Sequence, residues 1–271
     1  MNNDIGPLQE IARQIRCDVM TMIHLAGDGH PGPALSVVDL VTALYFRVLN
    51  INPADPAWPK RDRFILSKGH ACPTLYAALA RRGFFSPEVL PSLRSLGSIL
   101  QGHPDMKRTP GIDSTSGSLG NGISIGLGMV LAARVNLQDY FTYVIVGDGE
   151  IQEGIVWEAA MAAFHYKAGR LIVFVDNNGY QSGDAISKIS GLNPIIPKWE
   201  AFGWHCQEID GHDMRAILTA VERAQQAEDR PSCIVANTVK GKGIPFMEAD
   251  NSWHKRVPTK DELDKALAFL A

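Results

Sequence analysis

Two short apolar segments of the sequence each end in residues that suit a cation or a phosphate group. Asp148 lies in a Gly-Asp-Gly turn after residues 140–146, and Asn178 ends an Asp-Asn-Asn turn after residues 171–175. Both segments are too short for helices and almost wholly apolar, as is typical of parallel strands buried on both faces. Ligands of open parallel sheets bind outside the carboxyl ends of the strands. Because the 30 residues from Asp148 to Asn178 match one βαβ unit, we expect these two side chains to meet.

A carboxylate and an amide oxygen at such a place favour a hard divalent cation. Mg²⁺ takes oxygen ligands at about 2.0 to 2.1 Å and combines one or two carboxylates with substrate phosphates. Asp148, Asn178 and a diphosphate would satisfy it, and the neighbouring glycines let the backbone approach phosphate oxygens. Either turn alone is more often only a turn after a strand. The two together, at this spacing, favour a cation-diphosphate site.

The elements that must position this site alternate along the chain. Residues 155–168 read as a helix between the two strands, which makes a parallel βαβ unit. Residues 97–122 are rich in Gly, Pro, Ser and Thr, and a long irregular segment of this kind is usually functional. We expect a three-layer α/β domain with a mainly parallel sheet, and a single domain over residues 1–271. The other expected elements are helices at 8–25, from Ser36 onward, 73–82, 87–96 and 214–227, and strands at 63–66, 205–209 and 233–239.

Composition excludes several classes of protein. The chain has 271 residues, 45% of them hydrophobic, and a formal net charge of −3, so neither a nucleic-acid nor a membrane surface is expected. Residues 1–10 do not read as a signal peptide, and no apolar run is long enough to span a bilayer. The four cysteines form no CxxC pair and are expected to be reduced thiols. These features predict a cytoplasmic protein.

Histidines are the next candidates for chemistry, because their ordinary pKa of about 6.5 lies near working pH. The chain has eight histidines. Three of these lie in helix or strand patterns and are expected to be packing residues: His24, His165 and His205. His212 precedes a helix, which makes capping its expected role. The four that lie in expected loops beside Gly, Pro or Trp are the candidates for a site: His30, His70, His103 and His254.

Seven short sequence blocks, each containing Gly, His, Asp or Asn, are spread along nearly the whole chain. They are GHPG at 29–32, SKGHA at 67–71, GHP at 102–104, GSLG at 117–120, GDG at 147–149 with QEG at 152–154, NN at 177–178 and WH at 253–254. In these blocks the sequence resembles the transketolase group of thiamine diphosphate enzymes, and specifically the N-terminal subunit of a split transketolase. The resemblance covers the diphosphate-binding domain, so we expect another polypeptide to supply the pyrimidine-binding domain.

The resemblance implies a role for each matching residue. The cation, Mg²⁺ or else Ca²⁺ or Mn²⁺, would be held by Asp148, Asn178 and the backbone carbonyl of Tyr180. The residues that would face the sugar and move its protons are His30, His103 and His254. The residues that would contact thiamine diphosphate are His70, Gly117, Ser118, Leu119, Asp148, Gly149, Glu153, Glu158 and Asn178. The implied reaction moves a two-carbon ketol unit from a ketose to an aldose.

Glu153 and Glu158 have a simpler interpretation as well. Acidic residues near a helix N-terminus are favourable by about 0.3 to 1 kcal/mol without any other role. In the family that this chain resembles, these positions join a carboxylate network across the subunit interface, beside a glutamate that activates the cofactor. That glutamate belongs to the pyrimidine-binding domain, which the resemblance does not cover. The implied partner is therefore a C-terminal transketolase subunit, in an α2β2 assembly, and the implied substrate is a sugar or sugar phosphate.

The sequence departs from single-chain transketolases at two places. Ser118 stands where many of them have proline, and the run Lys240-Gly241-Lys242-Gly243 stands where they have apolar residues between the glycines. Both features are similar to the split-subunit branch. We expect the two lysines to lie in a solvated turn; the alternative is that they face an anionic substrate or partner as point charges. A GxGxxxG pattern at 120–126 mimics a dinucleotide fingerprint but does not follow a strand, so close helix packing explains it better.

Two other functions stay open at this point. The α subunit of a 2-oxo acid dehydrogenase also combines GDG with NN, although the His-Pro and Lys-Gly-His blocks argue against it. A metal-diphosphate binding protein without catalysis is the alternative outside enzymes, and the loop histidines argue against that. The sequence leaves open which ketose and which aldose react.

Overall fold

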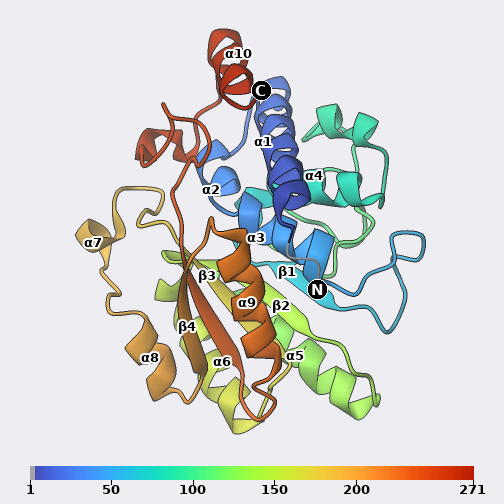
Figure 1. The fold of residues 1–271 in the computed structure, drawn as a ribbon, viewed down its shortest axis with the longest axis vertical. Helices are drawn as coiled ribbons and strands as arrows, with labels where there is room; N and C mark the ends of the chain where they lie inside the picture. Colours follow the sequence, from blue (N-terminus) through green and yellow to red (C-terminus); the bar gives the residue numbers. More distant parts are fainter. Residues whose placement is uncertain (1–3) are drawn as a thin grey trace.

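The structure, a computed structural model, describes residues 4–271 and contains a central parallel sheet (Figure 1). The sheet that these residues form has five strands in the order β1-β2-β3-β5-β4, and every neighbouring pair is parallel. The strands are β1 (Arg63–Leu66), β2 (Thr142–Gly147), β3 (Leu171–Asn177), β4 (His205–Asp210) and β5 (Ser232–Asn237). The expected mainly parallel sheet is confirmed, with all predicted strands in place.

Helices cover both faces of the sheet, because side chains alternate along each buried strand. Tyr143 and Ile145 of β2 pack into one core, and Val144 and Val146 into the other. The helices of the first core include α1 (Gly6–Ala26), α2 (Pro31–Ser36), α3 (Val38–Ala43), α4 (Cys72–Arg82) and α9 (Met214–Gln225). Those of the second are α5 (Asn121–Val135), α6 (Gly154–His165) and α8 (Ile196–Ala201). The predicted three-layer arrangement is therefore confirmed.

Two expected helices differ from the structure. Ser36 does not begin a helix but ends α2, which starts at Pro31, where a proline suits the first turn. The Ser36 hydroxyl donates to the Asp176 carboxylate instead of capping. Residues 87–96 form only a short 3₁₀ helix over Pro87–Ser92, because Pro91 inside it has no N–H to donate.

Gly126 of α5 and Gly120 at its N-cap serve close packing, as predicted. A Cβ on Gly126 would lie 2.9 Å from Val144 Cγ2, so the helix can approach β2 only without one. Gly120, with a φ of 87°, occupies the left-handed region that favours glycine. The segment before it, from residue 97, is irregular as expected apart from turns and bends.

The remaining elements are short, and most lie near the carboxyl ends of the strands or in the last part of the chain. They are a π-helix at Leu44–Val48, 3₁₀ helices at Gly69–Ala71, Glu150–Gln152 and Asn251–His254, α7 (Ile186–Ile189) and α10 (Lys260–Phe269). None of the helices in the described residues could cross a bilayer. All four cysteines are free thiols. Residues 1–3, part of the stretch considered for a signal peptide, lie outside the described residues.

Candidate functional site

Asp148 and Asn178 meet at the carboxyl ends of β2 and β3, as their spacing predicts. The Asp148 carboxylate accepts hydrogen bonds from the backbone N–H of Gly149 at 2.9 Å and of Gly179 at 2.6 Å. The second bond joins the two turns directly. Because Asp148 and Asn178 line the same cavity, a ligand held there would contact both strand ends.

A buried ion pair beneath this point orients Asn178. Asp176, which is fully buried, accepts from Lys68 Nζ at 2.5 Å and from Asn178 Nδ2 at 2.9 Å. Burial by itself raises the pKa of Asp176, but the Lys68 ammonium and the hydrogen bonds from Lys68, Thr238 and Ser36 bring that pKa below its usual value. The bond to Asp176 uses the amide nitrogen of Asn178. The amide oxygen is thereby kept as the acceptor on the other side.

Asp148 is a buried carboxylate in an unfavourable electrostatic position. Burial, together with the nearby charge of Asp176, raises the pKa of Asp148 to about 7. A divalent cation would relieve this cost, because it favours the ionised form. Among the described residues no three His, Cys, Asp or Glu side chains gather to hold a metal. A cation here would thus need further oxygens, such as backbone carbonyls and the phosphates of a ligand.

A cavity of about 490 Å³ opens above these strand ends and collects most of the predicted site. The predicted site residues that line it are His30, His70, His103, Gly117, Leu119, Asp148, Gly149, Glu153, Asn178, Tyr180 and His254. Ser118 and Glu158 are exposed and do not line it. Glu153 is exposed at the N-cap of α6 and makes no capping hydrogen bond there.

Three of the loop histidines form one cluster on the cavity wall. The ring centroids of His30, His70 and His254 lie 5.2, 5.4 and 5.6 Å apart, and His103 lines the same cavity. Burial, then the charge of Arg94, lowers the pKa of His30 to about 4. Burial also lowers the pKa of the other three. These histidines are therefore neutral at pH 7 and present one N–H and one acceptor nitrogen each.

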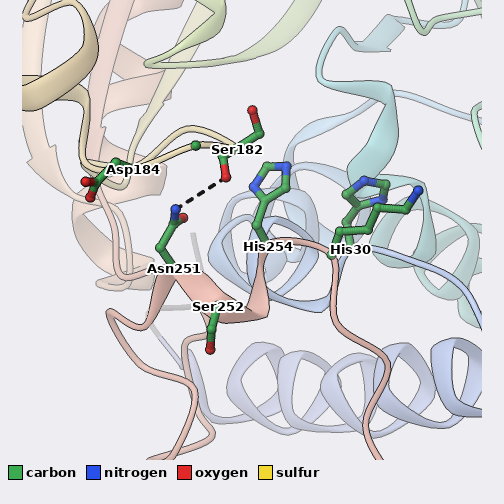
Figure 2. A pocket seen from close by; sticks show the side chains of 8 residues that line it. His30, Ser182, Asp184, Asn251, Ser252 and His254 are labelled. Atoms are coloured by element: carbon green, nitrogen blue, oxygen red, sulfur yellow. Dashed lines mark hydrogen bonds between the residues drawn. The ribbon is translucent and has the colours of Figure 1, made fainter.

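A second, wider hollow of about 730 Å³ adjoins the cavity (Figure 2). His30 and His254 line both spaces, so the histidine cluster forms their common wall. The opposite side of the hollow carries Ser182, Asp184 and Asn251. The site therefore has an inner cavity beside the strand ends and an outer hollow lined by hydroxyl, amide, carboxylate and imidazole groups.

Three buried charged residues that line the cavity were not predicted from the sequence: Lys68, Glu150 and Lys240. Glu150 accepts from the Ser67 hydroxyl and from the backbone N–H groups of Gly120 at 2.7 Å and Gly147 at 3.0 Å, and burial raises its pKa. Lys240 is only 1% exposed, so the expectation of a solvated turn is wrong for this lysine. Two features of the sequence could have indicated these residues: Glu150 lies directly after the Gly-Asp-Gly turn, and Lys68 lies in the Ser-Lys-Gly-His block. For Lys240 the local sequence gave none.

His212 also differs from its expected role. Asp213 caps α9, accepting from the backbone N–H groups of Arg215 and Ala216. The His212 ring instead bridges Asp39 at 2.7 Å and the backbone N–H of Val239 at 2.8 Å. It therefore anchors the turn that carries Lys240.

Comparison with known proteins decides the family. A family model described as the thiamine diphosphate binding domain of transketolase matches residues 8–268. The chain belongs to this transketolase family. A 6-deoxy-6-sulfo-D-fructose transketolase subunit from Clostridium sp. strain MSTE9 is 46% identical over 263 residues, which are 97% of this chain and 96% of that protein. An apulose-4-phosphate transketolase subunit from Phocaeicola vulgatus is 39% identical over 92% of this chain and 88% of its own length.

Solved structures agree on the fold. Transketolase from Campylobacter jejuni superposes with a TM-score of 0.92 at 32% identity and covers 98% of this chain, but the match spans only 43% of that longer protein. The transketolase of Leishmania mexicana gives a TM-score of 0.91 at 30% identity, and 41% of its length is matched. The chain is thus similar to a split transketolase subunit over its length and to less than half of a single-chain transketolase.

Proposed function

We propose that this chain is the cofactor-anchoring subunit of a heteromeric transketolase that transfers a two-carbon ketol unit from a ketose to an aldose. The observation that carries the proposal is the meeting of Asp148 and Asn178 beside a cluster of neutral histidines in one cavity. The 46% identity to a named transketolase subunit supports it over nearly the whole chain.

The residues of the cavity fit thiamine diphosphate with a divalent cation. His30 Nδ1 is buried and has no hydrogen-bond partner among the described residues, as expected of an atom kept for a ligand. Asp148 carries a raised pKa that a cation would lower. At Gly149 a Cβ would come within 2.9 Å of Gln181 Cβ, so this turn is built without a side chain. The donor set is hard oxygen, which suits Mg²⁺.

Each residue has a proposed part in holding the cofactor. Asp148, the Asn178 amide oxygen and the Tyr180 carbonyl would bind Mg²⁺, or Ca²⁺ or Mn²⁺ in its place. The groups proposed to contact the cofactor around its diphosphate are His70, Gly117, Ser118, Leu119, Gly149, Glu153 and Glu158. Ser118 and Glu158 are exposed, so their contribution would lie at the interface with a partner. When bound, thiamine diphosphate supplies a thiazolium carbon that accepts the ketol unit.

The chain's own chemistry is the handling of sugar hydroxyls. His30, His103 and His254 present neutral imidazoles to the cavity, so each can donate to one sugar oxygen and accept a proton on the other nitrogen. Their lowered pKa values keep them uncharged throughout the neutral range. These residues would orient the ketose and exchange its protons.

A partner subunit completes the proposal. The relatives that match over most of their length are named as subunits, and the solved single-chain enzymes extend well beyond this chain. We infer an α2β2 assembly with a C-terminal transketolase subunit, in which this chain contributes one diphosphate-binding domain. The four free thiols fit a reducing, cytoplasmic compartment.

The proposed substrate is a sugar that carries an anionic group. The two relatives are named for a sulfonated and a phosphorylated sugar. Lys255, which is largely exposed, lines both the cavity and the outer hollow and offers a cation there. A 2-oxo acid as donor is the second candidate carried over from the sequence, but the relatives named here do not favour it.

The test is co-expression with a C-terminal transketolase subunit from the same organism, followed by a screen of phosphorylated and sulfonated ketose donors. We expect ketol transfer only when both chains, thiamine diphosphate and Mg²⁺ are present. Turnover of pyruvate in place of ketoses, or full activity of this chain alone, would overturn the proposal.

A further inference from the structure

Lys240 reaches the histidine cluster through a space that the fold keeps open for it. A Cβ on Gly32 would lie 3.1 Å from Lys240 Cγ and 3.3 Å from its Cε, so the lysine stem packs directly over this glycine. The backbone is tied down on both sides, because Gly241 N–H donates to Gly32 O at 3.1 Å and Ala249 N–H to Lys240 O at 2.9 Å. Packing over Gly32 and the backbone hydrogen bonds therefore fix the position of the Lys240 side chain.

The ammonium of Lys240 has two definite partners. Its Nζ donates to Asn251 Oδ1 at 2.5 Å and lies within hydrogen-bond distance of His254 Nδ1, at 2.9 Å. Asn251 is itself oriented, because its Nδ2 donates to the Ser182 carbonyl at 3.5 Å, as Figure 2 shows.

These bonds determine which nitrogen of His254 carries its proton. Burial lowers the pKa of Lys240 to about 8, so at pH 7 it is mainly an ammonium. An ammonium can only donate, so the Nδ1 atom that faces it must be an unprotonated acceptor. The proton of the neutral ring then lies on Nε2. His254 lines both hollows, and its ring lies edge-on to His30 with centroids 5.4 Å apart.

We propose that Lys240 is a positioning residue that fixes His254 as its neutral Nε2–H tautomer, so that His254 serves as a hydrogen-bond donor to an oxygen of the sugar. The inference rests on the proposed function for its substrate, but the tautomer itself is a property of this chain. It gives His254 a narrower role than that of a proton shuttle with an ordinary pKa.

The surroundings of His254 maintain this state. Burial lowers the pKa of His254 to about 3, and the charges of Lys240, His30 and Lys68 act in the same direction. The ring is thus uncharged in the neutral range, and Lys240 determines which of its two nitrogens carries the proton.

The first test measures the tautomer of His254 by ¹⁵N NMR. The full chain, labelled with ¹⁵N in its histidine rings, should show His254 with a protonated Nε2 and an unprotonated Nδ1, assigned by loss of its signals in His254→Gln. Lys240→Met removes the ammonium and keeps a stem over Gly32, and we expect it to give a mixture of tautomers. Lys242→Met, in the same turn but paired with Glu248, should leave the His254 signals unchanged. A single Nε2–H tautomer that persists in Lys240→Met would overturn the inference.

The second test is a double-mutant cycle on the assembled enzyme. Loss of one oriented donor typically costs about 10²- to 10³-fold in kcat, so a partial loss of the right tautomer should lower kcat/KM for the ketose about 10- to 100-fold in Lys240→Met. His254→Gln carries an amide N–H that needs no lysine to orient its proton. In that background Lys240→Met should cost less than about threefold.

The two outcomes separate the inference from the proposed function. Equal losses from Lys240→Met in both backgrounds would mean that Lys240 acts elsewhere, for example on the cofactor diphosphate, and would refute the positioning role. If the wild-type pair transfers no ketol unit at all, the proposed function fails, while the ¹⁵N spectra still decide the tautomer.

Discussion

The carboxylate of Asp148 accepts a hydrogen bond from the backbone N–H of Gly179 at 2.6 Å, which ties the end of β2 to the turn after β3. Asn178 precedes that glycine and is held from below by Asp176 at 2.9 Å. The two side chains proposed to hold a cation are therefore placed by bonds that exist without it. A site arranged in advance in this way loses little conformational entropy on binding.

Asp148→Ala should abolish Mg²⁺-dependent retention of thiamine diphosphate and leave the fold intact. The variant removes a proposed cation ligand, so we expect the cofactor affinity of the assembled enzyme to fall by more than about 100-fold. The variant should still fold, with a moderate loss of stability: two backbone N–H groups lose their acceptor, at about 1 to 3 kcal/mol each, and removal of a buried carboxylate with a raised pKa offsets part of that cost. Calorimetric titration with the cofactor and Mg²⁺ measures the first effect and thermal unfolding the second. The exposed Asp229→Ala is the control, and unchanged retention in Asp148→Ala would refute the metal role.

His30 should make the stability of the free chain depend on pH. Its pKa is lowered from about 6.5 in the unfolded chain to about 4 in the folded one. The folded state thus binds fewer protons, so this contribution is complete above pH 6.5 and is lost as the pH falls towards 4. Urea unfolding at several pH values should show a smaller loss of stability over that range in His30→Gln than in the wild type. Identical slopes for the two proteins would contradict the prediction.

Glu150→Ala should destabilise the fold by about 3 kcal/mol. Its carboxylate is the acceptor for the Ser67 hydroxyl and two backbone N–H groups, and leaving buried donors unsatisfied costs about 1 to 3 kcal/mol each. Glu150→Gln, which keeps one oxygen, should lose less. The exposed Glu153→Ala should stay within about 0.5 kcal/mol of the wild type. Denaturant unfolding of the three variants checks the order, which would be wrong if Glu150→Ala and Glu153→Ala matched.

Two alanine substitutions on α5 should act in opposite directions. Gly126→Ala places a methyl group 2.9 Å from Val144 Cγ2, and overpacking of this kind costs about 1 to 3 kcal/mol. Gly128 has nothing within 4 Å of such a Cβ. There alanine should stabilise the helix by about 0.5 to 1 kcal/mol. The packing role of Gly126 would be supported by a thermal unfolding midpoint below the wild-type value for Gly126→Ala and above it for Gly128→Ala.

The sheet and the meeting of its strand ends could be predicted because their causes are local. Residues 140–146 and 171–175 are apolar and short, which fixes their strand type, and parallel pairing then brings Asp148 and Asn178 to one edge. The histidines followed from their loops and from the family resemblance. The cavity collects His30, His70, His103 and His254 as that interpretation required.

What could not be predicted depends on contacts between distant segments. Ser36 looks like a helix cap in sequence, yet its hydroxyl donates to Asp176 across the first core. Lys240 looks solvated, because nothing near it in sequence reveals the space above Gly32. Glu150 is an ordinary acidic residue after a turn until Gly120 approaches its carboxylate. Burial of a polar group is decided by its partners, and local patterns do not contain them.

The order of the strands delays the assembly of the pocket during synthesis, because the bond from Gly241 to Gly32 lies after the last strand in the sequence. In the sheet, β5 lies between β3 and β4 although it is made after both. During synthesis β4 therefore has no neighbour to pair with until β5 emerges from the ribosome, and Lys240 follows only after that strand. The pocket is finished only once all five strands have been translated, so a nascent chain would acquire its coenzyme late in maturation.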